Sequence, residues 1–318
     1  MTYRAPDLAP YTPVPALDTE LADLGYDCVR GFADQRPITP SLVRSRLAEH
    51  RTATHTMLAT YRSSGDRTLI GAAALRPPAA PGGTGRLWGP LVRPGHRRRG
   101  LGRRLLIALT PALRSMDGTV TTTEIPNDRP GTHTFFQTAG WGKDLNGATL
   151  WKALLPLTSP TGPPPTTVRC AQPDEDLTRI DALYAAARPG DRNAARAGDR
   201  WRSDERFRNS CLTFADDGDR LLAAALVYPL AHTHPEESAE ALLGDLLLHP
   251  DAHDRSHLAL HAARWALTAA AHAAGATIAR TVVDDRDTTA LRLVQHLGFT
   301  KRATIRYYQP PQPEEALG

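Results

Sequence analysis

A basic stretch at residues 92–106, VRPGHRRRGLGRRLL, combines the residue types that bind phosphate groups. Its arginines can form paired hydrogen bonds with phosphate oxygens. Gly100 and Gly102 carry no side chain, so an anion can approach the backbone closely there. A helical pattern follows, and the first turn of a helix offers unpaired backbone N–H groups and the positive end of the helix dipole. The stretch therefore predicts a phosphate site at the start of this helix.

The residues predicted to contact the phosphates lie in the loop and the first helical turn: Arg97, Arg98, Arg99, Gly100, Leu101, Gly102 and Arg103. The same stretch could instead be a nucleic-acid patch or a solvated basic face, or its glycines could only mark the start of a helix. It lacks interleaved aromatic residues, and the chain shows no recognised RNA- or DNA-binding motif. We therefore expect no nucleic-acid partner.

The composition of the 318-residue chain is that of a globular protein, with a formal net charge of +4. Lysine occurs only at Lys143, Lys152 and Lys301, so almost all of the 38 basic residues are arginines. Together with abundant alanine and proline, this bias is typical of a GC-rich genome and is weak evidence for a nucleic-acid partner. The longest apolar run, residues 221–230, is about half of the ~20 residues that a membrane helix needs, so we expect no membrane span.

The cysteine content and the first residues bear on the compartment. Cys28, Cys170 and Cys211 are odd in number and show no CxxC spacing. They therefore predict free thiols, with neither a disulfide framework nor a metal site, in a reducing cytoplasm. The N-terminal residues lack a basic stretch followed by an apolar core, so we expect no signal peptide.

Two halves of similar pattern flank a proline-rich segment. Residues 158–165 (TSPTGPPP) read as a semi-rigid linker, which predicts one domain at 1–157 and another at 166–318. Leu-Val-Arg-Pro before the basic stretch is matched by Leu-Leu-His-Pro in the second half. Likewise, a Gly-Trp pair at residues 140–141 is matched by a Gly-Phe pair at 298–299 at nearly the same offset. These repeats predict duplication of one domain.

The elements that must position the basic stretch follow from hydrophobic periodicity and turn residues. In the first half, we expect helices at 17–24, 40–50, 100–114 and 131–139, and strands at 53–62, 67–76, 85–93, 118–125 and 147–155. In the second half, we expect helices at 255–273 and 287–297, and strands at 167–171, 209–216, 220–229, 239–249, 276–284 and 301–308. The fold class is therefore α/β, with a mixed sheet in each half. Pro111 is expected to kink the helix at 100–114 or to end it early.

The pattern Arg97-x-x-Gly100-x-Gly102, after a strand ending in Val-x-Pro and before Leu-Leu, resembles the acetyl-CoA signature of the GNAT superfamily of N-acetyltransferases. The order of elements resembles that family over residues 15–155 and again over 167–308. The resemblance implies two tandem GNAT-like domains, each a mixed, largely antiparallel sheet flanked by helices. The arrangement is similar to that of mycothiol synthase, although here the intact motif is in the N-terminal half. The implied cosubstrate is acetyl-CoA, with no metal.

The second half departs from the signature. Ser256 and Leu258 stand where the first half has its two glycines, and Asp254 adds a negative charge. A leucine side chain is expected to obstruct the approach of phosphate, and an aspartate to repel it. We therefore expect the second half to bind no coenzyme A.

The resemblance also implies where the reacting groups lie. In the family, the strand before the signature splays away from the next one, and a free backbone amide there meets the thioester carbonyl. That places the oxyanion donor at Leu91 or Val92 and the pantetheine arm along the same residues. Asn127 matches a family asparagine that contacts the pantetheine or the leaving sulfur.

The proton-transfer groups are less specific. Glu124, near the end of the strand at 118–125, is the preferred general base or amine-orienting group, although it could be a solvated strand-end glutamate. His133 is the alternative base, or a surface histidine. Many members of the family have a tyrosine four residues before the glycine of the final Gly-aromatic pair. Here Phe136 and Val294 hold that position, and neither can donate a proton. Water or another hydroxyl could protonate the thiolate, the thiolate could leave unprotonated, or the half could be non-catalytic.

The expected function is transfer of acetyl from acetyl-CoA to a primary amine of a small molecule, by direct attack, in a monomer or homodimer. Two alternatives stay open. The chain could be a non-catalytic acyl-CoA-binding or regulatory protein, or it could acetylate protein lysines.

Overall fold

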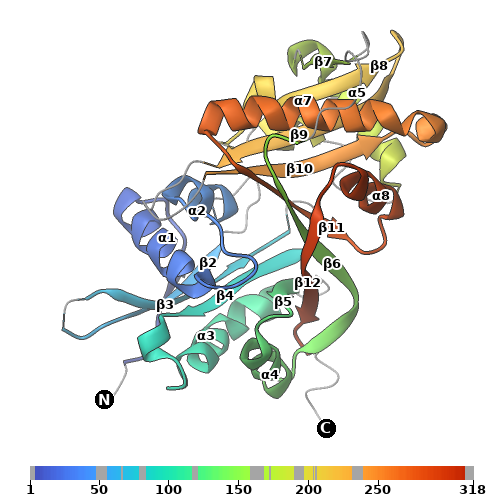
Figure 1. Cartoon of the computed structure of the whole chain (residues 1–318). Coiled ribbons are helices and arrows are strands. Elements are labelled where there is room, and N and C mark those ends of the chain that lie inside the picture. The colour runs from blue at the N-terminus through green and yellow to red at the C-terminus, as the bar shows by residue number, and fades with distance from the viewer. Residues whose placement is uncertain are drawn as a thin grey trace. The chain divides into compact units, whose positions relative to one another are not determined.

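The computed structural model describes residues 4–47, 56–65, 67–78, 84–116, 121–157, 168–171, 173–189, 197–202, 204, 206–230 and 239–311. The chain forms two compact units (Figure 1). The first comprises Met1–Gly147 together with Ile305–Gly318, and the second comprises Ala148–Thr304. The C-terminal segment thus belongs to the N-terminal unit. The predicted linker at 158–165 lies outside the described residues. The division into domains at 1–157 and 166–318 therefore stays a prediction.

The first unit is a sheet with helices on both faces. Its strands are β1 (Asp7–Pro10), β2 (Met57–Arg62), β3 (Leu69–Arg76), β4 (Gly85–Val92), β5 (Thr121–Pro126) and the end of β12 (Thr300–Gln309), in that spatial order. Its helices are α1 (Pro15–Val29), α2 (Pro40–Leu47), α3 (Leu101–Ser115) and α4 (Pro130–Thr138). The first residues of β6 (Gly142–Leu154) also belong to this unit. Its only parallel pair in the described residues is β4 with β5.

Alternate residues of β3 point to opposite faces of this sheet. Ala72 and Ala74 pack with α1 and α2, whereas Ala73 and Leu75 pack in the cluster that contains α3. Both faces are covered, which explains why β3 reads as a continuous apolar run rather than an alternating one.

Helix α3 buries the leucines that repeat every four residues. Leu101, Leu105 and Leu109 are each at most 1% exposed, and Leu113, the next leucine of the series, is partly buried. Gly100, with φ +77°, stands just before the helix. The helix continues through Pro111 to Ser115, so the expected early end at the proline is not found.

The second unit repeats this architecture. Its strands lie in the order β7 (Val168–Cys170), β8 (Leu212–Asp216), β9 (Leu221–Leu230), β10 (Glu240–Leu248), β11 (Ile278–Asp284) and the rest of β6. Its helices are α5 (Pro173–Ala187), α6 (Ala197–Arg202), α7 (Ser256–Ala274) and α8 (Thr288–His296). Here β10 and β11 form the parallel pair, which matches β4 and β5 of the first unit. The predicted α/β class, with a mixed sheet in each half, is confirmed.

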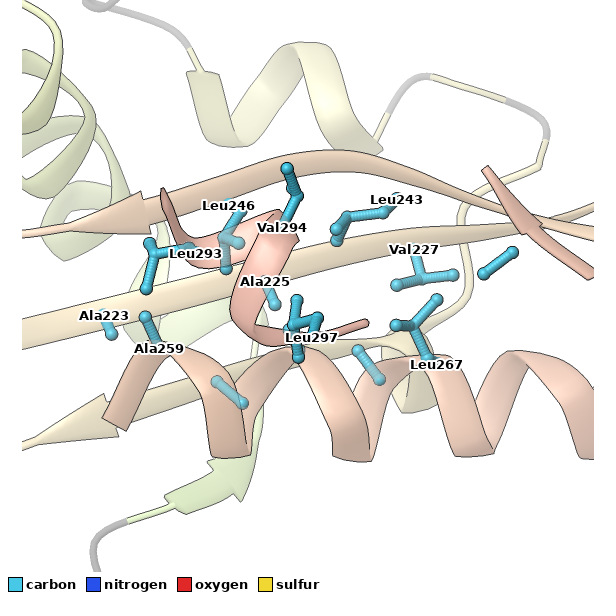
Figure 2. Packing of buried hydrophobic residues seen from close by; sticks show 14 of the residues in the cluster. Ala223, Ala225, Val227, Leu243, Leu246, Ala259, Leu267, Leu293, Val294 and Leu297 are labelled. Carbon is cyan, nitrogen blue, oxygen red and sulfur yellow. The ribbon is translucent and has the colours of Figure 1, made fainter. Parts of the chain in front are cut away.

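Alanines let α7 lie close to its sheet. Ala259, Ala262 and Ala266 are fully buried, and Ala223 and Ala225 of β9 face the same cluster. Figure 2 shows Ala223 and Ala225 of β9 in this cluster with Leu297, next to α8. Small side chains on both surfaces reduce the distance between helix and sheet and allow close packing.

Three elements were not predicted: β1, α5 and α6. The helix expected at 17–24 is longer in the structure, and the one expected at 40–50 is described to Leu47. The other predicted helices and strands are found, with ends that differ by a few residues.

Candidate functional site

The basic loop folds into a concave row of backbone groups. After β4 the chain makes one turn of 3-10 helix, η1 (Pro94–His96), and α3 begins at Leu101. Between them Arg98 has φ +62° and Gly100 has φ +77°. Left-handed residues interspersed in a turn aim successive N–H groups into one hollow, which is an anion-binding arrangement. A positive φ is strained for an arginine, and such strain is concentrated at functional sites.

The arginines of the loop are exposed around this hollow. Arg98, Arg99 and Arg103 are exposed, so their charges are accessible to a ligand. Arg97 is exposed too, but its Nε donates to the carbonyl oxygen of Val92 at 3.0 Å. Arg97 therefore connects the loop to the end of β4. The residues predicted to contact phosphate all lie in this loop and in the first turn of α3.

The two glycines of the motif, Gly100 and Gly102, differ in what surrounds them. A Cβ on Gly100 would meet nothing within 4 Å, so this position is open. A Cβ on Gly102 would lie 3.4 Å from the Phe135 ring and 3.8 Å from Pro90. Gly102 thus allows α3 to pack closely against α4 and β4. Room for phosphate at Gly102 stays a prediction.

Strands β4 and β5 separate next to this loop. Their parallel pairing is confined to Gly85 with Thr121 and Arg86 with Thr122 in the described parts of the strands. Beyond that point β4 stays paired with β3 as far as Val92, and β5 stays paired with β12 on its other edge. The facing edge of β4 is therefore open toward its carboxyl end.

A bulge at Gly89 and Pro90 accompanies the separation. The register of β4 on β3 shifts between Trp88 and Leu91, and Gly89 has φ +92°. A Cβ on Gly89 would lie 2.8 Å from the Leu91 nitrogen and 2.9 Å from the Ala72 oxygen, so only glycine fits there. Bulges re-aim the groups of a strand next to functional sites.

The hydrogen-bond pattern selects Val92 as the amide on the open edge. The Arg93 nitrogen donates to the Ile70 oxygen of β3 at 3.0 Å. Backbone groups of consecutive residues point to opposite edges of a strand, so the N–H of Val92 points away from β3. The Val92 carbonyl accepts from Arg97 and, at 3.5 Å, from the Cys28 thiol. Burial raises the pKa of the Cys28 thiol, so it stays protonated and can donate.

Glu124 is half-exposed on β5 and is held by an arginine. Arg86 Nη1 donates to Glu124 Oε1 and to the Thr122 hydroxyl, each at 2.9 Å. The side chain of Glu124 is 50% exposed. It is therefore accessible to a ligand, and the ion pair with Arg86 restricts its orientation.

Both ring nitrogens of His133 are engaged. Nε2 lies 3.0 Å from the carbonyl oxygen of Pro126, and Nδ1 lies 3.0 Å from the hydroxyl of Tyr308. A carbonyl can only accept, so Nε2 donates to Pro126, and in that tautomer Nδ1 accepts from the Tyr308 hydroxyl. Burial raises the pKa of Tyr308, which keeps that donor protonated. His133 thus ties α4 to β5 and β12, and sequence reasoning did not anticipate Tyr308.

Phe136 is a core residue. It is 2% exposed, and its ring lies 5.2 Å from that of Trp141 and 5.8 Å from that of Tyr308. Its packing stabilises α4 on the sheet. Asn127, in contrast, is exposed directly after β5.

The turn after α1 is attached to the turn after β5, another feature absent from the sequence reasoning. The Ala33 nitrogen donates to Asp128 Oδ2 at 2.6 Å, and Arg129 forms an ion pair with the buried Asp34. The Arg129 guanidinium also lies 4.6 Å from the centre of the Phe32 ring. These contacts fix the turn beside the carboxyl end of β5.

The second unit separates its parallel strands in the same way but lacks the basic hollow. The pairing of β10 with β11 ends at Leu242 and Arg280. From His249 to Ser256, a segment that the structure describes completely, no residue has a positive φ. The exposed Asp251 lies in the 3-10 helix η4 (Pro250–Arg255), near the start of α7. Leu258 is 6% exposed in the core, so the expected obstruction of phosphate by its side chain is wrong.

These features agree with the comparisons to known proteins. Residues 27–141 match the model of the acetyltransferase (GNAT) family. This segment is a GNAT acetyltransferase domain. It includes the basic loop, both separating strands and α4. The first unit thus contains a domain of the acetyltransferase type.

The similar solved structures extend the fold to the whole chain. A tandem GNAT protein from the clavulanic acid biosynthesis pathway is 18% identical, with a TM-score of 0.72, and the match covers 96% of this chain and 98% of that one. A GCN5-related N-acetyltransferase from Sphaerobacter thermophilus is 16% identical, with a TM-score of 0.67 over 95% of each chain. The N-myristoyltransferase of Saccharomyces cerevisiae, solved with myristoyl-CoA, is 9% identical, with a TM-score of 0.66 over 97% of this chain and 79% of that one. Tandem GNAT architecture is thus shown at the level of fold.

The comparison with curated protein sequences gives no match. Among the described residues, no helix has both the length and the apolar character needed to cross a membrane. The same residues include no group of three or more His, Cys, Asp and Glu side chains placed to hold a metal ion.

Proposed function

We propose that this chain transfers the acetyl group of acetyl-CoA to the primary amine of a small molecule, and that the first unit carries out the reaction. The observation that carries the proposal is the strained basic loop at the start of α3, beside the separated ends of β4 and β5. A hollow of backbone N–H groups suits a pyrophosphate, and an open strand edge suits an extended chain with amide groups. The residues present thus fit coenzyme A.

The loop residues would hold the phosphates. Backbone N–H groups from Arg98 to Gly102 would contact the pyrophosphate, and the exposed arginines, including Arg99 and Arg103, would add charge-assisted hydrogen bonds. Arg97 would serve mainly to fix the loop to Val92. Leu101 anchors the helix start in the core. Each of these roles follows from whether the side chain is exposed, bonded or buried.

The open edge of β4 would position the acyl group, which coenzyme A supplies as an activated thioester. The N–H of Val92 is the donor for the thioester oxygen, because it points away from β3. The pantetheine arm would lie along Leu91 and Val92. Asn127, exposed at the end of β5, would contact its far end.

Glu124 is the proposed group that orients the amine and accepts its proton. Its carboxylate is accessible, and Arg86 holds it in one orientation. His133 is a poorer base because Pro126 and Tyr308 occupy both of its nitrogens. Phe136 is buried, so the leaving thiolate would be protonated by water or leave as the anion.

We further propose that the second unit binds no coenzyme A and that the chain acts in the cytoplasm, as a monomer or homodimer. The proposed lack of coenzyme A binding by the second unit is supported by Asp254, which is exposed where the first unit has Arg98, and by the exposed Asp251 nearby. The proposed cytoplasmic location is supported by the cysteines, because Cys28, Cys170 and Cys211 form no disulfide with one another.

The test is a coenzyme A release assay on the full chain with a panel of amines: polyamines, aminoglycosides, amino acids, cysteinyl sugars and a lysine peptide. We expect turnover with a small-molecule amine. Glu124→Gln should keep its affinity for acetyl-CoA and lose ~10²–10⁴-fold in turnover, the usual contribution of a general base. Glu20→Gln is the matched control, because Glu20 also pairs with an arginine, Arg62, at 2.6 Å.

Each other outcome points elsewhere. Turnover with the lysine peptide alone would identify a protein acetyltransferase. Tight binding of acetyl-CoA without turnover on any amine would identify a binding or regulatory protein. Normal turnover in Glu124→Gln would assign the proton transfer to water.

A further inference from the structure

The second unit contains a cavity of about 160 Å³ beside the carboxyl end of β10. Its lining includes Leu246 of β10, Pro250 of the following turn and Asp287 from the turn after β11. In α/β sheets, ligands bind outside the carboxyl ends of parallel strands, where the following loops meet. The separation of β10 from β11 places this cavity at such a point. The proposed acyl transfer does not use it.

Arg188 is a fixed positive group in the wall of this cavity. Its Nη1 lies 3.0 Å from Asp245 Oδ1 and 3.2 Å from the Tyr184 hydroxyl. Asp245 is itself held, because its Oδ2 accepts from Trp201 Nε1 at 2.8 Å. Burial lowers the pKa of Arg188, but Asp245, Tyr184 and Asp287 together outweigh burial, so the pKa is raised overall. The guanidinium is thus charged and held in place before any ligand arrives.

Asp287 places a negative group next to Arg188. Its Oδ1 accepts from the Ala290 nitrogen at 2.9 Å and caps α8. Its Oδ2 is 3.9 Å from Arg188 Nε, near the outer limit of an ion pair. The side chains of Arg188 and Asp287 are 31% and 30% exposed. The cavity wall therefore carries a positive group, Arg188, next to a negative group, Asp287, and the two form only a weak ion pair.

Apart from His253 and Thr289, the rest of the lining is apolar. Ala186, Ala187 and Pro189 come from the end of α5, and Leu246 and Pro250 face them from β10 and its turn. A cavity of about 150 Å³ accommodates a benzene-sized molecule. The space thus suits a ligand with a short aliphatic group and not a peptide or a nucleotide.

We propose that this cavity binds a free α-amino acid with a small aliphatic side chain. Its carboxylate would pair with Arg188, its ammonium with Asp287, and its side chain would lie against Ala186 and Leu246. A zwitterion offers an opposite charge to each of the two charged groups in the wall, Arg188 and Asp287. A simple anion would be repelled by Asp287, whereas an ammonium completes the pairing.

The proposal goes beyond the proposed function and is tested without acetyl-CoA. Calorimetry of the full chain with L-valine should show one site per chain. N-acetyl-valine lacks the ammonium and isobutylamine lacks the carboxylate, so each should bind at least tenfold more weakly. Asp287→Asn should weaken L-valine binding at least tenfold while keeping the helix cap, because asparagine caps helices as well as aspartate does. Ala186→Leu should fill the cavity and have the same effect.

Asp285→Asn is the matched control, since Asp285 is two residues away and accepts from the Thr149 hydroxyl outside the cavity. It should bind L-valine as the unmodified chain does. Thermal unfolding and acetyl-CoA binding should be unchanged in all three variants. The proposal is overturned if L-valine gives no saturable heat at millimolar concentration. It is equally overturned if N-acetyl-valine binds as tightly as L-valine, or if Asp287→Asn and Ala186→Leu both keep full affinity.

Discussion

The left-handed conformation of Gly100 predicts how one methyl group should weaken acetyl-CoA binding. Gly100→Ala adds a Cβ that meets no atom within 4 Å, so no steric clash with the protein arises. The cost is conformational, because φ is +77°. A left-handed conformation costs an L-residue about 1–2 kcal/mol. If the free loop relaxes and must return to this shape around the phosphates, that cost corresponds to roughly 5–30-fold weaker binding.

The matched control lies in the same loop. A Cβ on Gly95 would also meet nothing within 4 Å, but Gly95 does not have a positive φ. Gly95→Ala should therefore bind acetyl-CoA as the unmodified chain does. Titration calorimetry with acetyl-CoA measures both dissociation constants, and thermal unfolding checks that both variants fold. Equal affinities for Gly100→Ala, Gly95→Ala and the unmodified chain would refute the role of the strained loop.

Gly102 provides a contrast within the same motif. Its Cβ position lies 3.4 Å from Phe135, so a larger side chain pushes on α4. Gly102→Leu should lower thermal stability as well as affinity, since overpacking typically costs 1–3 kcal/mol. Gly100→Ala and Gly102→Leu thus separate a backbone effect at the ligand from a packing effect behind it.

Three further predictions concern the rest of the chain. Titration should give one acetyl-CoA per chain, since the second unit has no basic hollow; two equal sites would contradict this. Tyr308→Phe should lower the free energy of unfolding in urea by about 1 kcal/mol, because His133 Nδ1 loses its donor; an unchanged midpoint would show that this bond contributes nothing. Burial makes the pKa of the Cys28 thiol higher in the folded state than in the unfolded state. The neutral thiol therefore contributes its full stability at pH values below the unfolded-state pKa, and this contribution is lost as the pH rises through the folded-state pKa. Cys28→Ala should therefore show a smaller loss of stability above about pH 9 than the unmodified chain, as measured by urea unfolding at pH 7 and 10.

Much of the fold could be predicted because its signals are local. The leucines at 101, 105 and 109 share one helical face at any tertiary position, and all three are buried. The apolar strands and their turn residues likewise mark most of the sheet. Helix α5 was missed although Ile180, Leu183 and Tyr184 have helical spacing and are buried. This spacing is a local signal that predicts a helix at this position.

The sequence by itself determined the loop that can hold phosphates, because its arginines and glycines are contiguous and a left-handed glycine at a helix start is a local property. It also determined the duplication. Only the tertiary structure decided that Gly102 faces Phe135, that Leu258 is buried and that His133 is bonded to Tyr308, a residue far along the chain. It likewise decided that Arg188 and Asp287 line one cavity and that Asp245 holds Arg188 there. The reason is physical: a residue type limits what a side chain can do, but its neighbours from distant strands and helices set its burial, partners and charge.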